Sequence, residues 1–188
     1  ALPGDGAKKA FAVIWTTTAW TLPANQALNA HPDLDYALVD TPRGVLLLAE
    51  SLVESCLQRY GLAGEILSSA KGEALRGLVF RHPLHDVGDA SSPLGYRRLS
   101  PMYLAEYVTA VDGIGSVPSS PAYGVDDYNS SVAHGLKYDD ILNPVQGNGS
   151  YTPELPLFGG MNIWKACPRI IEVLGESDRL MATRTITH

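Results

Sequence analysis

The apolar residues of this chain gather in short runs, and glycine, proline and polar residues separate the runs. Short runs rich in β-branched and aromatic residues are typical of strands. The predicted strands are residues 11–15, 35–40, 45–49, 66–70, 78–81, 102–109 and 180–187. The turn formers Thr41, Pro42, Arg43 and Gly44 lie between the second and third runs, which predicts a β-hairpin.

Helical spacing of apolar residues is less frequent. The predicted helices are residues 52–60, 125–134 and 168–174. Ser51 and Glu54 match the S-x-x-E capping box at the start of the first helix, and Gly61 is placed to end it. Pro168 suits the first turn of the third helix, because proline lacks the N–H that a first turn leaves unused.

The remaining segments are polar and rich in glycine, serine and proline. Residues 87–98 are expected to form a surface loop, and residues 147–149 a turn. The alternation of strands and helices that a doubly wound sheet requires is missing. The pattern therefore predicts one β-rich α+β domain over residues 1–188, with a few short peripheral helices.

Composition and charge narrow the possible functions. Hydrophobic residues make up 45% of the chain and charged residues 18%, which is enough apolar material for a core. The net charge of -6 argues against a basic surface that grips a long nucleic acid, although a pocket for one nucleotide end remains compatible with it. No apolar run reaches the ~18 residues of a membrane span, and no signal-peptide pattern is present. We therefore expect a cytoplasmic protein with no membrane partner.

Cysteine and histidine residues show no metal-site spacing. Cys56 and Cys167 do not form a C-x-x-C pair, and free thiols in a reducing cytosol are favoured over a disulfide. His82, His85 and Asp86 lie in the sequence R-H-P-L-H-D, which lacks a ligand spacing. We therefore expect surface or structural roles for these side chains and no metal site.

A threonine-rich segment, W-T-T-T-A-W-T-L-P-A-N, occupies residues 15–25 directly after the first predicted strand. Its hydroxyl groups could donate to a phosphate, a ribose or a carbonyl group and could position a water molecule, and its tryptophans could stack on a base. Threonine is equally a common strand residue, and tryptophan a common core residue. Composition alone favours this structural explanation.

A second segment, residues 113–128, places small residues before a helix that starts with Asp126 and Asp127. Small residues let a ligand approach the backbone closely. A carboxylate at a helix N-terminus is favoured in its ionised form and can receive an ammonium group. Acidic residues at helix starts are also ordinary caps, so a small-ligand cleft and a simple cap both remain open on spacing alone.

Together the two segments resemble the two signatures of the editing insertion in isoleucyl-tRNA synthetases. The first signature is W-T-T-T-x-W-T-L-P-A-N and the second is G-x-G-x-V-x-x-x-P-A-x-G-x-x-D-Y. Residues 31–39, 142–145 and 157–160 also fit, so the resemblance covers nearly the whole chain. Valyl and leucyl enzymes are similar but carry T-T-R-P-x-T at the first signature, so Trp15 and Trp20 favour the isoleucyl family.

The resemblance implies a barrel-like editing domain of the Val/Ile/Leu-tRNA synthetase type, inserted into a class I catalytic core. Such a domain hydrolyses the ester of valine wrongly attached to isoleucine tRNA and contributes to clearing valyl-adenylate. It needs no cofactor, although the parent enzyme uses ATP and magnesium. Its partners would be the 3′ end of the tRNA and the remainder of the synthetase chain, in a monomeric protein. The start at Ala1 and the end at His188 fit the expectation of a fragment.

Site residues follow from the matched positions. The expected catalytic residues are Thr17, Thr18 and Asp127, and the expected substrate-binding residues are Thr16, Trp20, Thr21, Pro118, Ser119, Tyr123 and, again, Asp127. The resemblance implies that Asp127 holds the α-ammonium group of the substrate. No general base is evident, so we hypothesise that an ordered water and the free ribose hydroxyl suffice.

The chain departs from the family pattern at three positions. Ala19 replaces the usual proline, Ile114 the usual threonine, and Pro118 the usual histidine that helps to exclude isoleucine. Pro118 has neither an imidazole nor a backbone N–H. Either another side chain discriminates, or hydrolysis is weakened or lost and the domain only binds the tRNA 3′ end. An editing domain of a valyl or leucyl enzyme is the third interpretation. The synthetic motifs H-I-G-H and K-M-S-K-S are absent, so no synthetic activity is expected.

Overall fold

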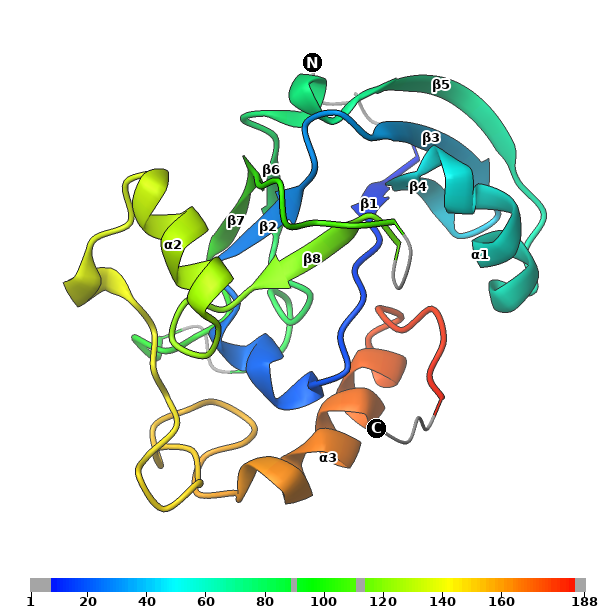
Figure 1. Ribbon diagram of the computed structural model, residues 1–188. Coiled ribbons are helices and arrows are strands. Elements are labelled where there is room, and N and C mark those ends of the chain that lie inside the picture. Colours follow the sequence, from blue (N-terminus) through cyan, green and yellow to red (C-terminus); the bar gives the residue numbers. More distant parts are fainter. Residues whose placement is uncertain (1–7, 89–90, 111–113, 185–188) are drawn as a thin grey trace.

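Two four-stranded sheets form the framework of the computed structural model, which describes residues 8–88, 91–110 and 114–184 (Figure 1). The first sheet has the order β1-β4-β3-β5, with bounds Ala10–Ala12, Gly44–Ala49, Asp35–Thr41 and Glu65–Lys71. The second has the order β6-β7-β2-β8, with bounds Val79–Arg81, Leu99–Leu104, Ala27–Ala30 and Ser116–Ser119. Strands β1 and β4 are parallel, as are β2 and β7, and the other pairs are antiparallel.

This architecture confirms the predicted β-rich α+β class with a few short helices. The sheets do not close into a barrel over the residues that the structure describes. The predicted hairpin is confirmed by β3 and β4, which pair from Tyr36↔Ala49 to Thr41↔Gly44. The Thr41 hydroxyl donates to the Gly44 carbonyl oxygen at 2.7 Å and thereby closes the turn.

Several predicted strands differ in their bounds. Strands β5 and β6 match the predicted runs, but β1 stops at Ala12 instead of continuing to residue 15. The Val13 N–H still donates to the Leu47 carbonyl oxygen, at 3.1 Å, and the chain then leaves the sheet towards the threonine-rich segment. Strand β7 begins and ends earlier than predicted. The Ala105 N–H still donates to the Ala30 carbonyl of β2, and the chain then turns, with the Val108 N–H donating to the Ala105 carbonyl at 3.3 Å. The strand predicted at 180–187 is wrong for residues 180–184, which are irregular, and residues 185–187 lie outside the described part.

Helix α1 (Val53–Tyr60) ends at Gly61 as predicted, and Gly61 adopts the left-handed conformation with a φ of 64°. The predicted capping box is wrong. Residues 50–52 form a short 3-10 helix, η2 (Glu50–Leu52), and α1 then begins without any side-chain cap. Because η2 already continues into α1, the Ser51 hydroxyl is not placed at an N-cap.

Helix α2 (Val125–Ala133) is confirmed, and the predicted turn at 147–149 is closed by the Gly149 N–H, which donates to the Gln146 carbonyl at 2.9 Å. Helix α3 (Ile163–Glu176) is longer than predicted. Its N-cap is Asn162, whose side chain accepts the Trp164 N–H. Pro168 therefore lies inside the helix rather than in its first turn. The remaining 3-10 helices are η1 (Ala19–Ala24), η3 (Gly72–Leu75) and η4 (Tyr138–Asp140).

Three apolar clusters stabilise this arrangement. One lies between the two sheets, with Leu28 of β2 against Leu47 of β4. A second lies between the first sheet and α1 and contains the buried free thiol of Cys56. The third packs α3 against η1 through Ile170 and Leu22, below the second sheet in Figure 1. Cys167 is half-buried and also free.

Glycine at position 115 allows the two sheets to meet. Gly115 has a φ of +78°, a conformation that favours glycine, and a Cβ atom at this position would collide with the Ala49 side chain of β4. The Tyr36 hydroxyl donates to the Gly115 carbonyl oxygen, and the Ala49 N–H donates to the Ile114 carbonyl at 3.1 Å. The start of β8 is therefore fixed directly against the first sheet.

Candidate functional site

The threonine-rich segment is ordered largely by its own hydroxyl groups. The Thr18 N–H donates to the Thr16 hydroxyl oxygen at 3.0 Å, and the two hydroxyl oxygens lie 3.3 Å apart. The Thr21 N–H and hydroxyl both donate to the Thr18 carbonyl oxygen, each at 3.0 Å. Thr17 is exposed, and its hydroxyl has no hydrogen-bond partner within the described part of the chain. The segment thus presents one free hydroxyl while its neighbours fix the backbone.

The side chains of Arg98 and His82, which lie outside the segment, donate hydrogen bonds to carbonyl groups in and directly after η1. The Arg98 guanidinium donates to the carbonyl oxygens of Pro23 and, at 2.8 Å, Asn25. The His82 Nε2 lies 2.8 Å from the carbonyl oxygen of Leu22. The carbonyl groups of Pro23 and Asn25 lie at the end of η1, where intrahelical partners run out, whereas the Leu22 carbonyl also accepts the Asn25 N–H at 3.0 Å. Burial lowers the pKa of Arg98 to about 10, so it stays protonated at neutral pH.

His82 is a neutral structural residue. Its Nδ1 accepts the Leu84 N–H at 3.1 Å, so its Nε2 carries the hydrogen that is donated to Leu22. Its ring stacks on Tyr96 at 5.3 Å between centroids. Burial, together with the charge of Arg98, lowers the pKa of His82 to about 3. The structural role expected from the sequence is confirmed for this residue.

Asn25, the last residue of the first signature, is buried and fully engaged. Its side-chain amide donates to the Ala27 carbonyl at 2.8 Å and to the Ser119 carbonyl at 3.1 Å. Its Oδ1 accepts the Ser100 hydroxyl at 2.9 Å. Asn25 therefore joins η1, β2, β7 and β8, and it has no polar group left for a substrate.

The second signature passes through β8, at the edge of its sheet. Pro118 is buried and lies opposite Leu28 of β2 in the register. An edge strand tolerates proline because one side of its backbone is not used by the ladder. Side chains alternate along a strand, so Pro118 faces the same side as Ser116, whose hydroxyl donates to the Val13 carbonyl at 2.5 Å. Pro118 therefore faces the segment that leads into the threonines.

Ser119 faces the opposite side and is fully buried. Its hydroxyl oxygen lies 3.4 Å from that of Ser131 in α2. In this conformation its side chain is directed into the interior. Its predicted role in substrate binding stays a prediction.

Asp127 lies in the first turn of α2, as predicted, and its carboxylate is firmly held. Its Oδ2 accepts the backbone N–H of Ser120 at 2.8 Å, and its Oδ1 accepts the hydroxyl of Tyr107 at 2.8 Å. An ionised carboxylate offers about four lone-pair positions. These two bonds therefore leave capacity for a further donor.

The structure brings the two signatures together through Ser120. The Ser120 hydroxyl donates to the Thr21 carbonyl at 2.9 Å, while its N–H holds Asp127. Thr21 in turn bonds Thr18. A continuous chain of hydrogen bonds thus connects the threonine-rich segment to the carboxylate of α2.

Aromatic contacts add a second connection between the signatures. The Trp20 and Tyr123 rings meet edge to face, with centroids 5.0 Å apart, and Trp164 of α3 lies 6.4 Å from Trp20. The Trp20 Nε1–H is buried and has no acceptor among the described residues. A buried donor without a partner is costly, and a bound acceptor group would satisfy it.

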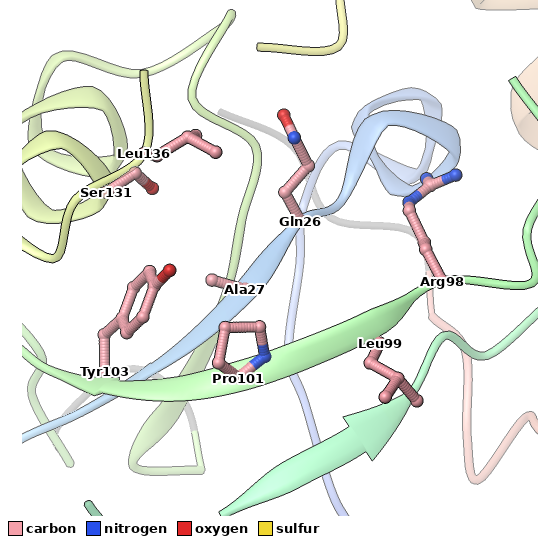
Figure 2. A pocket seen from close by; sticks show the side chains of 8 residues that line it. All are labelled: Gln26, Ala27, Arg98, Leu99, Pro101, Tyr103, Ser131 and Leu136. Carbon is pink, nitrogen blue, oxygen red and sulfur yellow. The ribbon is translucent and has the colours of Figure 1, made fainter. Parts of the chain in front are cut away.

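A separate shallow hollow of about 260 Å³ lies on the second sheet beside α2 (Figure 2). It is lined by Gln26, Ala27, Arg98, Leu99, Pro101, Tyr103, Ser131 and Leu136. None of the site residues predicted from the sequence lines it. The Arg98 guanidinium at its border is already bonded to three carbonyl groups, including Gly95 at 3.0 Å. The hollow therefore offers no built polar site.

Over the described residues, no group of three or more histidine, cysteine or acidic side chains is arranged to hold a metal ion. No helix in the same part of the chain is both long and apolar enough to cross a bilayer.

Sequence reasoning missed several residues that hold this site. Tyr107 and Asn29 lie outside both signatures, and their importance depends on contacts with residues far away in the chain. Ser120 lies inside the second signature but was interpreted only as a small residue. Gly115 was expected to let a ligand approach, whereas Ala49 of β4 occupies the space beside it. Gly113, in the same segment, lies outside the described residues.

Comparison with curated proteins gives consistent relatives. The chain is 57% identical over 176 residues to the isoleucine–tRNA ligase of Ectopseudomonas mendocina and 54% identical over 182 residues to that of Chromohalobacter salexigens. These alignments cover 94% and 96% of the chain but only 18% of each relative. The chain therefore corresponds to less than a fifth of the length of these ligases. No family model matches the chain.

Solved structures show the same fold at low identity. The crystal structure of GlLeuRS-CP1 superposes with a TM-score of 0.70 at 14% identity, covering 98% of this chain and 86% of that one. The editing domain of the Plasmodium falciparum cytosolic leucyl-tRNA synthetase gives a TM-score of 0.61 at 12% identity, covering 92% and 79%. The resemblance drawn from the two signatures is confirmed. The chain is closely similar to one segment of bacterial isoleucine–tRNA ligases, and its fold is that of a synthetase editing (CP1) domain.

Proposed function

We propose that this chain is the editing domain of an isoleucyl-tRNA synthetase and hydrolyses valine from mischarged isoleucine tRNA. In this reaction a water molecule attacks the ester carbonyl carbon, and the bond from that carbon to the ribose oxygen breaks. The products are free valine and a tRNA with its terminal hydroxyl restored. Valyl-adenylate would be cleared by the same chemistry, with AMP as the leaving group.

The observation that carries this proposal is the hydrogen-bonded connection from Thr18 through Thr21 and Ser120 to Asp127. It supports the proposal because it joins the threonine hydroxyl groups to the half-buried Asp127 carboxylate through fixed hydrogen bonds. The carboxylate would bind the α-ammonium group of valine, while the threonines would bind the terminal adenosine and the attacking water.

The need for such a site is energetic. A binding pocket distinguishes two substrates that differ by one methylene by only ~1–3 kcal/mol, a limit for which isoleucyl-tRNA synthetases are the standard example. A second, smaller pocket that admits valine and excludes isoleucine removes the remaining errors. The high identity to isoleucine ligases, against 14% or less to the leucyl domains named above, favours valine on isoleucine tRNA as the substrate.

The partners follow from this proposal. The domain would receive the 3′ end of isoleucine tRNA and would act within a monomeric, cytoplasmic synthetase whose other parts use ATP and magnesium. The net charge of -6 supports weak binding of tRNA by this segment alone, because phosphate contacts need basic side chains. Most contacts with the tRNA would come from the remainder of the synthetase.

A second candidate is a binding module that has lost hydrolysis, and Pro118 is the observation that favours it. A buried proline in β8 supplies neither a donor nor a titratable group where the resemblance implies a histidine. The Thr17 hydroxyl and the Asp127 carboxylate are retained, so the hydrolytic proposal is preferred.

The test measures deacylation of valyl-tRNA and isoleucyl-tRNA, both on isoleucine tRNA, by the full-length polypeptide that contains these residues. The proposal expects rapid loss of valine, with isoleucine spared, and strong loss of activity in Asp127→Ala. Loss of both amino acids would indicate a pocket without discrimination. Retention of both would support the binding module and would overturn the enzymatic proposal.

A further inference from the structure

A partly buried chain of side-chain hydrogen bonds ends on the Asp127 carboxylate. The Ser130 hydroxyl donates to the Asn29 Oδ1 at 2.7 Å, and the Asn29 amide donates to the Tyr107 hydroxyl oxygen at 2.8 Å. The Tyr107 hydroxyl then donates to the Asp127 Oδ1 at 2.8 Å. These four side chains come from α2, from β2 and from the segment after β7.

The direction of each bond in this chain is fixed. A tyrosine hydroxyl has one hydrogen and can also accept. Because the Asn29 amide occupies the oxygen of Tyr107 as a donor, the single hydrogen of Tyr107 is directed to Asp127. Asn29 is fully buried in β2 between β7 and β8, so it cannot exchange this partner for water. The arrangement therefore supplies Asp127 with a donor whose orientation is set in advance.

The Tyr107 hydroxyl also keeps its hydrogen at neutral pH. Burial, together with the negative charge of Asp127, raises the pKa of Tyr107 well above its ordinary value. The Ser120 N–H holds the other carboxylate oxygen. With one donor on each oxygen, the plane of the carboxylate is fixed rather than free to rotate.

We propose that Tyr107 and Asn29 are positioning residues of the editing site, which fix the Asp127 carboxylate so that its remaining lone pairs receive the α-ammonium group of the aminoacyl ester. This inference rests on the proposed function and adds the residues that make Asp127 effective. Neither residue touches the substrate. Their effect passes through Asp127, and preorganisation of this kind reduces the entropy lost on binding.

The experiment is a double-mutant cycle in the full-length polypeptide. Deacylation of valyl-tRNA on isoleucine tRNA is measured for the wild type, Tyr107→Phe, Asp127→Ala and the double variant, with the enzyme concentration varied to separate half-saturation from the maximal rate. Tyr107→Phe is expected to raise the half-saturation constant about tenfold, with a smaller change in the maximal rate. In the Asp127→Ala background the same substitution is expected to have almost no effect, because its partner is gone.

Two further variants separate positioning from folding. Tyr96→Phe is the control, because the Tyr96 hydroxyl also donates to an acceptor within the protein, the Pro156 carbonyl at 2.8 Å, and Tyr96 is more deeply buried than Tyr107. It is expected to lower the melting temperature at least as much as Tyr107→Phe while leaving half-saturation unchanged. Asn29→Asp keeps the shape of residue 29 but accepts the Tyr107 hydrogen instead of donating. Where this variant stays folded, it is expected to weaken valyl-tRNA binding as much as Tyr107→Phe does.

The outcomes are distinguishable. Unchanged half-saturation in Tyr107→Phe would overturn this inference, and a loss in Asp127→Ala alone would leave the proposed function standing. Equal effects of Tyr107→Phe with and without Asp127 would also overturn it, because the tyrosine would then act independently. Absence of deacylation by the wild type would overturn the proposed function first and this inference with it.

Discussion

The hydroxyl of Ser120 donates a hydrogen bond to the carbonyl oxygen of Thr21 at 2.9 Å, across 99 positions of the sequence. This bond attaches the segment of the second signature, residues 113–128, to the threonine-rich segment, residues 15–25. Ser120→Ala removes it and keeps the backbone N–H that binds Asp127. We expect the free energy of unfolding to fall by about 1 kcal/mol and deacylation to fall with it, because the threonines lose a support.

Ser177→Ala is the matched control for this prediction. The Ser177 hydroxyl donates to the Val173 carbonyl at 2.8 Å, at the end of α3. Chemical denaturation of both variants should give similar losses of stability, whereas only Ser120→Ala should slow deacylation. Equal deacylation in the two variants would mean that the bond between Ser120 and Thr21 does not support the site.

Stability should depend on pH through His82. The pKa of this buried histidine is lowered to about 3, so between roughly pH 6.5 and pH 3 the unfolded chain binds a proton that the folded chain does not. Stability therefore falls as the pH drops through this window. Between pH 7 and pH 5 the loss from this residue should be about 2 kcal/mol, since one pKa unit corresponds to ~1.4 kcal/mol.

His82→Gln tests the origin of that dependence. Glutamine can still donate to the Leu22 carbonyl but does not titrate, so this variant should be less stable than the wild type at pH 7 and less sensitive to acid. The measurement is urea denaturation at pH 7, 6 and 5. An unchanged slope of stability against pH in His82→Gln would assign the acid sensitivity to other groups.

Asn25 should be important for folding rather than for chemistry. Asn25→Ala removes the side-chain bonds to the Ser100 hydroxyl and to the carbonyls of Ala27 and Ser119, of which the Ser119 carbonyl keeps the Gln26 N–H, and we expect a loss of about 2 kcal/mol. Asn25→Asp should be worse at neutral pH, because a carboxylate would face the carbonyls of Ala27 and Ser119. Thermal melts rank the two variants, and an Asn25→Asp protein as stable as the wild type would contradict this account.

Discrimination between valine and isoleucine should respond to position 118. Pro118→His introduces the side chain that the resemblance implies, on the face of β8 that it shares with Ser116, whose hydroxyl bonds Val13 just before the threonine-rich segment. We expect the ratio of valyl-tRNA to isoleucyl-tRNA deacylation to rise about tenfold, within the ~1–3 kcal/mol that one methylene provides. Pro118→Ala is the control and should not raise the ratio. A decrease with histidine would show that another side chain already fills this role.

The sequence correctly predicted those helices and strands whose signals lie within one short segment of the chain. The hairpin of β3 and β4, helix α1 with Gly61, and helix α2 with its acidic first turn all depend on spacing within one segment. Strands β2 (Ala-Leu-Asn-Ala) and β8 (Ser-Val-Pro-Ser) were not predicted, because they are short and contain almost no β-branched or aromatic residues. Helix α3 begins at Ile163, before Pro168, because tertiary packing against η1 outweighs the local cost of a proline inside the helix.

The site likewise contains some residues that the sequence identified and others that only the folded structure reveals. The resemblance identified the threonines and Asp127, and in the structure hydrogen bonds through Ser120 connect the two. No local pattern distinguishes Tyr107 or Asn29 from other polar residues near strand ends. Their roles arise from hydrogen bonds to residues 20 and 101 positions away, respectively, which only the folded structure brings together.

Because Gly115 lies directly against Ala49, amino-acid variation at these two positions reports on the packing between the two sheets. A larger residue at either position would push β8 away from the first sheet and would displace Ser120 with it. Invariance of this glycine among relatives would thus reflect steric exclusion between two sheets and would carry no information about the ligand. Variants with a larger residue at Gly115 should therefore yield less folded protein, and they should also reduce deacylation per folded molecule, because Ser120 would lose its bond to Thr21.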